Sequence, residues 1–473
     1  MEQLPGGDAV FLGMEIPEAP GHVGGLTVLD PSAAPEFGFA RLVEVVSERI
    51  GLAPRYTQKL REVVLGLDRP YLVHDPDFDA AKHIHRIAVP APGGMRELAD
   101  LIAYLFSRPL DRRKPLWELW FIEGVENERV ALFMKSHHCL MDGQVGAGLG
   151  ELLCDLEPNP ERGPILPPAS SPRGQREFSD LEIALRGAGN LIRTPLRMAS
   201  FGRRLLRQSW EMLRSARDPE APPLPFTLPQ TPFNRQIGSQ RAFACASLSL
   251  EQVKEVKKHF DVTVNDVLLA LTASALRTYL DQRLQLPERP LAGLIAISKR
   301  SQGDLEMGNQ ITSVPVGLAT DIADPVQRLL RIHRNAAKAK QMAKAYDADM
   351  LRGIGESLPP GLLNLLMRAM NSSEAPAGLP ANVIVSNVRG TPVPLYCAGA
   401  RIECMYPMSI LAPGQGLNVT LVSYMGRVDV GFTVDPELVP DAWQLAEEVP
   451  RALTELLSAA RQRVEAEARA ARG

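Results

Sequence analysis

The chain has 473 residues, of which 45% are hydrophobic and 23% charged, and its net charge is -3 at pH 7. This balance is typical of a soluble globular protein, and the length favours two domains. The charge argues against nucleic-acid binding, because nucleic-acid-binding domains are usually basic. Five scattered cysteines without a CxxC pair indicate reduced thiols and a cytoplasmic protein. We expect no transmembrane helix, because no apolar run reaches about 18 residues.

In the N-terminal part, periodicity predicts helices over 38–51 and 92–107 and strands around 68–89 and 115–136. The second strand region leads into two adjacent histidines, His137 and His138, followed by Asp142 and Gly143. Apolar residues alternate along 130–135, as in a strand. Imidazole has an unperturbed pKa of about 6.5, which suits a general base. The sequence therefore predicts a catalytic base where this strand ends.

Neighbouring residues of an extended segment point to opposite faces, so only one of the two histidines can easily face a substrate. We assign the base to His138, and leave His137 either structural or assisting. The same geometry predicts no metal site, because adjacent histidines with one Asp do not match the usual ligand spacing. A Cys-His pair through Cys139 is a minor alternative, because it would need an activated thiolate.

Two proline-rich stretches, 157–172 and 219–232, predict connectors. They bound a predicted helix from about 180 to 217 that Pro195 starts or kinks. The helix is basic and amphipathic, with its arginines at positions 193, 197, 203, 204, 207, 214 and 217. Such a helix either lies in a membrane interface or packs on its own protein with the arginines in solvent. The connectors divide the chain into 1–158, 159–232 and 233–473.

The C-terminal part again mixes helices and strands, which gives an α/β or α+β fold. The predicted helices cover 250–260, 264–283, 324–345, 350–370 and 440–469. The predicted strands cover 291–299, 310–318, 381–388, 400–406, 417–425 and 427–434. Asn265 and Asn309 are polar residues in otherwise apolar blocks. Each either donates a hydrogen bond to an oxyanion or serves locally, Asn265 as a helix cap and Asn309 in a turn.

The histidine segment, His137-His138-x-x-x-Asp142-Gly143, resembles the HHxxxDG motif of the CoA-dependent acyltransferase superfamily. Further blocks resemble the bacterial wax ester synthase/diacylglycerol acyltransferase family in order and content, from about residue 8 to residue 435. They are DAVFL at 8–12, HVGGL at 22–26, PLW at 115–117, ND at 265–266, GNQ at 308–310, SNVRG at 386–390 and GLNVT at 416–420. Two departures, Thr391 before Pro392 and Tyr56 after Pro54-Arg55, leave acceptor choice in doubt.

The resemblance implies two chloramphenicol-acetyltransferase-like domains in a sandwich, with the active site at their interface. It implies direct acyl transfer with His138 as general base, without a covalent acyl-enzyme and without a cofactor. It also implies that Asp142 forms a structural ion pair, for which Arg300 is our candidate partner; a catalytic dyad with a histidine is the alternative. Ser386, Asn387 and Arg389 line the interface or reach the CoA phosphates, and Arg389 suits anion binding.

The resemblance implies an O-acyltransferase that moves a long fatty acyl chain from acyl-CoA to diacylglycerol or a fatty alcohol. Its partners would be these substrates and, peripherally, the inner membrane face or a lipid droplet. One alternative is acylation of another hydroxyl or amine. Another is a catalytically silent paralogue that binds lipid, although the intact HHxxxDG motif argues against it.

Overall fold

The computed structural model describes residues 2–140, 153–160, 179–215, 218, 222–224, 227–298, 311–345, 350–373 and 378–470. Helices and strands alternate along both halves of this part of the chain, which confirms the predicted fold class. Four residues of the predicted site, Asp142, Gly143, Arg300 and Asn309, lie outside the described residues.

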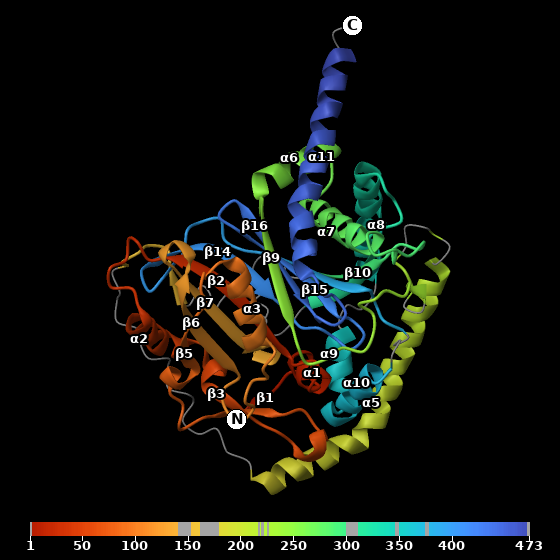
Figure 1. Ribbon diagram of the computed structural model, residues 1–473. Helices are drawn as coiled ribbons and strands as arrows, with labels where there is room; N and C mark the ends of the chain where they lie inside the picture. The colour runs from red at the N-terminus through yellow and green to blue at the C-terminus, as the bar shows by residue number, and fades with distance from the viewer. Residues whose placement is uncertain are drawn as a thin grey trace.

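The first sheet carries the histidine strand, β7 (Arg129–His137), at its centre (Figure 1). On one side β7 pairs with β6 (Trp117–Val125), which pairs with β5 (Ile84–Ala88). On the other side it pairs with β2 (His22–Asp30), in which His22 lies opposite His137. A smaller sheet joins β1 (Glu2–Gln3), β4 (Tyr71–His74) and β3 (Gln58–Arg61). The predicted strand regions 68–89 and 115–136 thus each contain two strands, and helices α2 (Phe39–Arg49) and α3 (Met95–Phe106) match the predictions closely.

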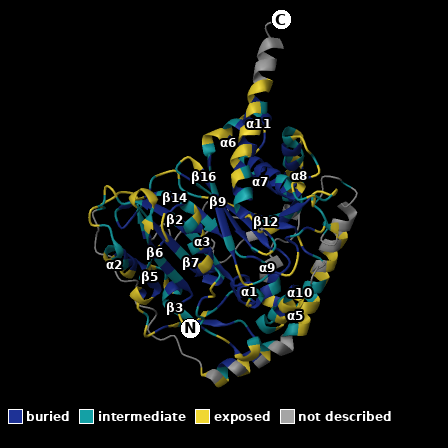
Figure 2. Cartoon of the chain, viewed as in Figure 1, coloured by how far each residue is buried: buried dark blue, intermediate teal, exposed yellow. Residues whose placement is uncertain are grey.

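The second sheet is built from the C-terminal part of the chain. In the described residues its order is β11 (Ile311–Gly317), β10 (Ala292–Ser298), β12 (Val383–Arg389), β15 (Leu417–Tyr424), β16 (Arg427–Val434) and β9 (Ala242–Ser249). The helices that pack with it are α6 (Leu250–Phe260), α7 (Val264–Asp281), α8 (Pro325–Ala345) and α11 (Ala442–Ala470). Buried apolar residues of these helices and of the sheet form one hydrophobic core. Figure 2 shows much of the sheet and of α7 as buried.

The two sheets meet at β14 (Ala400–Met408), which comes late in the chain but pairs with β2 of the first sheet. On its other side β14 pairs with the short strand β13 (Tyr396–Cys397), which in turn pairs with β8 (Cys154–Asp155). Residues 1–158 therefore do not build the first sheet alone. The division of the chain at residues 158 and 232 stays a prediction.

Helix α1 (Gly6–Met14) joins the two halves, because it packs against α9 (Met350–Ser357) and α10 (Pro360–Asn371) (Figure 1). A Cβ on Gly355 of α9 would lie 1.9 Å from the carbonyl oxygen of Gly6, so only glycine allows this approach. We predicted one helix over 350–370, and this was wrong. The chain bends between α9 and α10 because proline disfavours a helical residue before it and removes an N–H, and two prolines stand in succession at 359 and 360.

Helix α5 (Asp180–Ser215) confirms the predicted helix between the connectors, and Pro195 lies inside it. It runs along the side of the molecule that holds α9 and α10 (Figure 1). Ile183 is buried against Val63 and Tyr71, and a Cβ on Gly353 of α9 would lie 3.0 Å from the ring of Phe201. One side of α5 therefore packs on the protein. Among the helices of the described residues, none combines the length and the apolar character needed to cross a membrane.

Candidate active site

His137 ends β7 with its side chain buried, 1% exposed, and bonded at both ring nitrogens. The backbone N–H of Cys139 donates to Nδ1 over 3.1 Å, and Nε2 lies 3.1 Å from a carboxylate oxygen of Glu15. Because Nδ1 accepts a hydrogen bond, the proton sits on Nε2, which donates to Glu15. The ring is thereby fixed in one tautomer and one orientation. This arrangement makes His137 a residue that orients the turn after β7.

Glu15 is itself held by Arg112, whose Nη2 lies 2.6 Å from the same carboxylate oxygen. The other end of the guanidinium donates to Glu62 over 2.7 Å. Burial alone would raise the pKa of Glu15, but the hydrogen bond and charge of His137 and the charge of Arg112 outweigh it and lower this pKa to about 2. Glu15 is ionised at neutral pH, as the acceptor for His137 must be.

Gly21 brings a loop against the histidine pair. A Cβ at this position would lie 2.5 Å from Nε2 of His137 and 3.2 Å from the carbonyl oxygen of Phe11, so a larger residue would displace the ring. The carbonyl of Gly21 accepts the backbone N–H of His138 over 2.9 Å. This bond fixes the main chain at the point where the strand turns into η6 (His138–Leu140).

The ring of His138 stacks on the ring of Phe11, with centroids 3.8 Å apart and planes 15° from parallel. Its Nδ1 is buried and has no hydrogen-bond partner among the described residues. The residue is half-buried, and burial of the imidazole lowers its pKa to about 4. A hydrogen bond with the backbone of His138 itself opposes this lowering, and the charge of His137 adds to it. His138 is therefore neutral at pH 7 and able to accept a proton.

Four residues around the histidines received no role from the sequence: Phe11, Glu15, Gly21 and Arg112. Phe11 and Arg112 belong to blocks that carry the family resemblance, or directly adjoin one, so their segments were recognised. Their contacts with the histidines were not, because these contacts join α1, the 107–116 loop and β7, which are far apart in sequence. Glu15 stands outside any block and Gly21 directly precedes the block at 22–26. The contacts of both residues with the histidines are found only in the folded structure.

The C-terminal candidates lie at the ends of α7 and β12. Asn387 Nδ2 donates to Asn265 Oδ1 over a long 3.4 Å, so the structure brings these two amides together. Asn265 does not cap α7, because Thr263 and Asp266 form the capping box there. The capping reading of Asn265 is therefore wrong, and its side chain is left for another role. Along β12, Ser386 is half-buried, whereas Asn387 and Arg389 are exposed.

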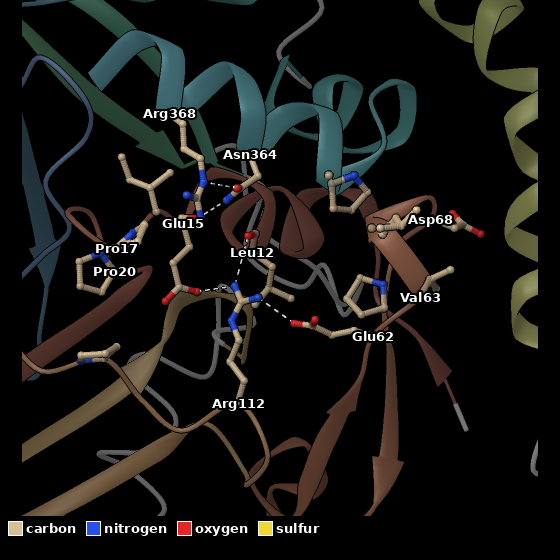
Figure 3. Close-up of a pocket in the computed structure, with 17 residues that line it drawn as sticks. Leu12, Glu15, Pro17, Pro20, Glu62, Val63, Asp68, Arg112, Asn364 and Arg368 are labelled. Atoms are coloured by element: carbon tan, nitrogen blue, oxygen red, sulfur yellow. Dashed lines mark hydrogen bonds and ion pairs between the residues drawn. The ribbon is translucent and has the colours of Figure 1, made fainter. Parts of the chain in front are cut away.

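A cavity of about 470 Å³ lies next to Glu15 and Arg112, between α1, the loop η3 (Val64–Gly66) and α10 (Figure 3). Leu12 and Glu15 of α1 and its following loop form one wall, so the carboxylate that holds His137 also faces the cavity. Helix α10 contributes Asn364, which donates to the backbone carbonyl of Glu15, and Arg368. The cavity thus combines apolar surface with a few polar groups, as ligand sites usually do.

The remaining site predictions fall on residues that the structure does not describe. The proposed ion pair of Asp142 with Arg300, the turn at Gly143 and the role of Asn309 stay predictions. In the described part of the chain, no group of three or more His, Cys, Asp or Glu side chains is arranged to hold a metal ion.

Comparison with known proteins provides evidence that is independent of the geometry of the site. Residues 4–268 match the wax ester synthase/diacylglycerol acyltransferase catalytic domain, and residues 307–457 match the C-terminal domain of that family. A putative diacylglycerol O-acyltransferase of Mycobacterium tuberculosis is 37% identical over 97% of this chain and 90% of its own length. A probable diacylglycerol O-acyltransferase of the same species is 33% identical over 96% of this chain and 99% of its own.

Among solved structures, a wax ester synthase/diacylglycerol acyltransferase from Marinobacter aquaeolei superposes with a TM-score of 0.69 at 28% identity, covering 97% of this chain and 99% of that one. The first condensation domain of the CDA synthetase superposes with a TM-score of 0.57 at 14% identity, over 97% of this chain and 95% of that domain. The second likeness is one of fold alone.

Proposed function

The chain belongs to the wax ester synthase/diacylglycerol acyltransferase family and is an acyltransferase, and from this premise we propose that it transfers a long-chain fatty acyl group from acyl-CoA to diacylglycerol. Fatty alcohols are a second acceptor class, which would give wax esters. The observation that carries the proposal is the neutral imidazole of His138 where β7 ends, stacked on Phe11. Its neighbour His137 is bonded to Glu15, which lines a partly apolar cavity.

The proposed reaction is direct. His138 takes the proton of the acceptor hydroxyl while the hydroxyl oxygen attacks the thioester carbonyl, which gives a tetrahedral oxyanion and an imidazolium. Collapse of this intermediate breaks the carbon–sulfur bond, and the imidazolium returns its proton to the leaving CoA thiolate. A positioned base of this kind contributes about 10²- to 10⁴-fold to the rate. The ester and free CoA leave, and the enzyme is unchanged.

The neighbouring thiol of Cys139 does not favour an acyl-enzyme. Burial raises the pKa of this thiol, and the nearby carboxylates of Asp8 and Glu15 raise it further. A nucleophilic cysteine requires a lowered pKa, because the thiolate is the reactive form. This supports direct transfer over a two-step route through Cys139.

Other residues take supporting roles in the proposal. His137 positions the turn that presents His138. Asn265 and Asn309 are the candidates for donating to the oxyanion, an interaction worth about 3 to 4 kcal/mol when one donor is removed. Asn387 and Arg389 are exposed on β12 next to Asn265, and we assign them with Ser386 to the CoA side. We place the enzyme in the cytoplasm, in peripheral contact with the inner membrane face or a lipid droplet.

One assay tests this function against its alternatives. Purified protein is incubated with radiolabelled palmitoyl-CoA and a panel of diacylglycerol, fatty alcohol and other hydroxyl or amine acceptors, and the products are separated by thin-layer chromatography. His138→Ala serves as the blank. We expect labelled triacylglycerol that depends on His138. Product only with another acceptor would overturn the diacylglycerol assignment, and no product with any acceptor would favour a silent lipid-binding paralogue.

A further inference from the structure

Large apolar side chains gather on the outside of the molecule where η3 and α10 meet. Leu65 is 82% exposed at the tip of η3, and Leu365 is 62% exposed on α10. Their neighbours Val64, Leu362 and Leu366 are also exposed. Single exposed apolar residues are normal on soluble proteins, but a contiguous group marks an interaction surface. We call these five residues the apolar rim.

The rim is one surface although its two parts lie about 300 residues apart in sequence. A Cβ on Gly66 would lie 2.6 Å from the backbone nitrogen of Gly361, and a Cβ on Gly361 would lie 2.3 Å from the carbonyl oxygen of Leu65. The two backbones touch, and only glycines permit this contact. Gly66, at φ +61°, also needs the conformation that glycine adopts freely. This backbone contact fixes the position of the leucines of η3 relative to those of α10.

The fold itself gains little from Leu65. Its φ is 56°, in the left-handed region that costs an L-residue stability, and its side chain packs on little of the protein. A strained backbone that presents a bulky apolar side chain to solvent points to a use outside the fold.

The rim adjoins the cavity, because Leu65 belongs to both. Leu65 and Gly66 on one side, and Pro360 and Gly361 on the other, belong to its lining, whose inner wall is formed by Leu12 and Glu15 (Figure 3). A ligand that enters past the rim arrives next to the carboxylate that holds His137.

Helix α5 adds positive charge beside the rim. It is anchored next to η3, because Asn190 Nδ2 donates to Asp68 over 2.7 Å. Farther along, it exposes Leu196, Leu206 and Trp210 together with Arg203, Arg204 and Arg207, and much of its outer side is exposed (Figure 2). Exposed apolar side chains with arginines on one helix are the combination that binds anionic lipid interfaces.

We propose that the apolar rim inserts into an anionic lipid surface, with α5 lying against the headgroups, so that the cavity receives the lipid acceptor directly from that surface. This rests on the proposed function for the identity of the acceptor, but the docking surface itself does not require catalysis. We choose anionic lipid as the occupant because the exposed apolar side chains of the rim lie beside the exposed arginines of α5.

The test uses the full chain and sedimentation with vesicles of phosphatidylcholine and phosphatidylglycerol. Leu65→Glu and Leu365→Glu probe the two halves of the rim separately. Leu284→Glu is the matched control, because Leu284 is 96% exposed, has a φ of 54° and follows α7, outside the rim. All three variants change the net charge equally. Melting temperature and circular dichroism establish that each one is folded.

We expect each rim variant to lower vesicle affinity by about tenfold or more, since burying a leucine side chain contributes that much, and the control to bind like the unchanged protein. Unchanged binding of either rim variant, or an equal loss in the control, would overturn the proposal. Vesicle binding is measured without substrate. A protein that binds through the rim but transfers no acyl group would refute the proposed function and leave the docking surface standing.

Discussion

The stacking of Phe11 on His138 provides a direct test of the proposal that this histidine is the general base. In the structure, the phenyl ring covers one face of the imidazole at 3.8 Å, and burial lowers the pKa of His138 to about 4. Phe11→Ala would open that face to water, whereas Phe11→Leu would keep it covered by an apolar side chain. The two variants therefore separate burial of the imidazole from other effects of changing α1.

The expected change in the pKa of His138 follows from how far burial has already lowered this pKa. Full exposure would return the pKa of His138 from about 4 to the ordinary value of 6.5 for histidine, a change equivalent to roughly 3 kcal/mol. Phe11 covers only one face, so we expect Phe11→Ala to raise the pKa by about one unit. At pH 5 the neutral fraction of His138 would then fall from about nine-tenths to about one-half, while at pH 7 it would stay near one.

The measurement is the pH dependence of kcat/KM between pH 4.5 and 8, because this parameter reports the pKa of the essential base in the free enzyme. Phe11→Ala should move the acidic limb upward by about one unit, and Phe11→Leu should leave it in place. Phe11 is buried, and truncating such a residue costs about 3 to 5 kcal/mol, so circular dichroism at each pH confirms the folded state. An acidic limb in Phe11→Ala identical to that of the unchanged enzyme would refute burial as the cause.

Three further outcomes are expected. His138→Ala should reduce acyl transfer by about 10²- to 10⁴-fold, whereas His137→Ala should keep measurable activity; reversed losses would show that the roles are exchanged. Glu15→Gln should lower the free energy of unfolding at pH 7 by up to roughly 3 kcal/mol in urea titrations, the equivalent of the shift in the pKa of Glu15. Since the folded-state pKa of Glu15 is depressed from 4.5 to about 2, this difference should be present above pH 4.5 and shrink as the pH falls toward 2; a constant difference would exclude its charge as the cause. Replacing Arg203, Arg204 and Arg207 by Glu should release the folded protein from anionic liposomes, and unchanged sedimentation would leave α5 as a helix packed on its own protein.

Local patterns in the sequence predicted much of the fold, because periodicity reports which face of an element is buried. The strand before His137 and helices α6 and α7 follow such patterns closely. Strand β2 was missed, since Gly24 and Gly25 interrupt its alternation. The break between α9 and α10 was also missed, although two successive prolines at 359 and 360 indicate that a helix is interrupted there. Likewise, Thr263 and Asp266 stand at capping-box spacing, a signal that would have excluded Asn265 as the cap.

Pairings across the whole chain could not be predicted in this way. The insertion of β14 beside β2 joins residues more than 370 positions apart, and no local pattern encodes such a partner. The same limit applies to the site. The motif pointed to His137 and His138, but Glu15 and Arg112 come together with them only because α1 and the 107–116 loop pack on the end of β7.

Helix α1 lies between α10, which carries part of the apolar rim, and the histidines. This position decides how the rim and the proposed base can be tested separately. Phe11 of α1 stacks on His138, while a Cβ on Gly13 of the same helix would lie 3.0 Å from Leu363 of α10. A substitution on the inner side of α10 would therefore shift α1 and disturb the base directly. Leu65 and Leu365 face solvent, so a change there reaches α1 least. A loss of lipid binding in these variants with the acidic limb of the pH profile unchanged would thus separate delivery of the acceptor from activation of its hydroxyl.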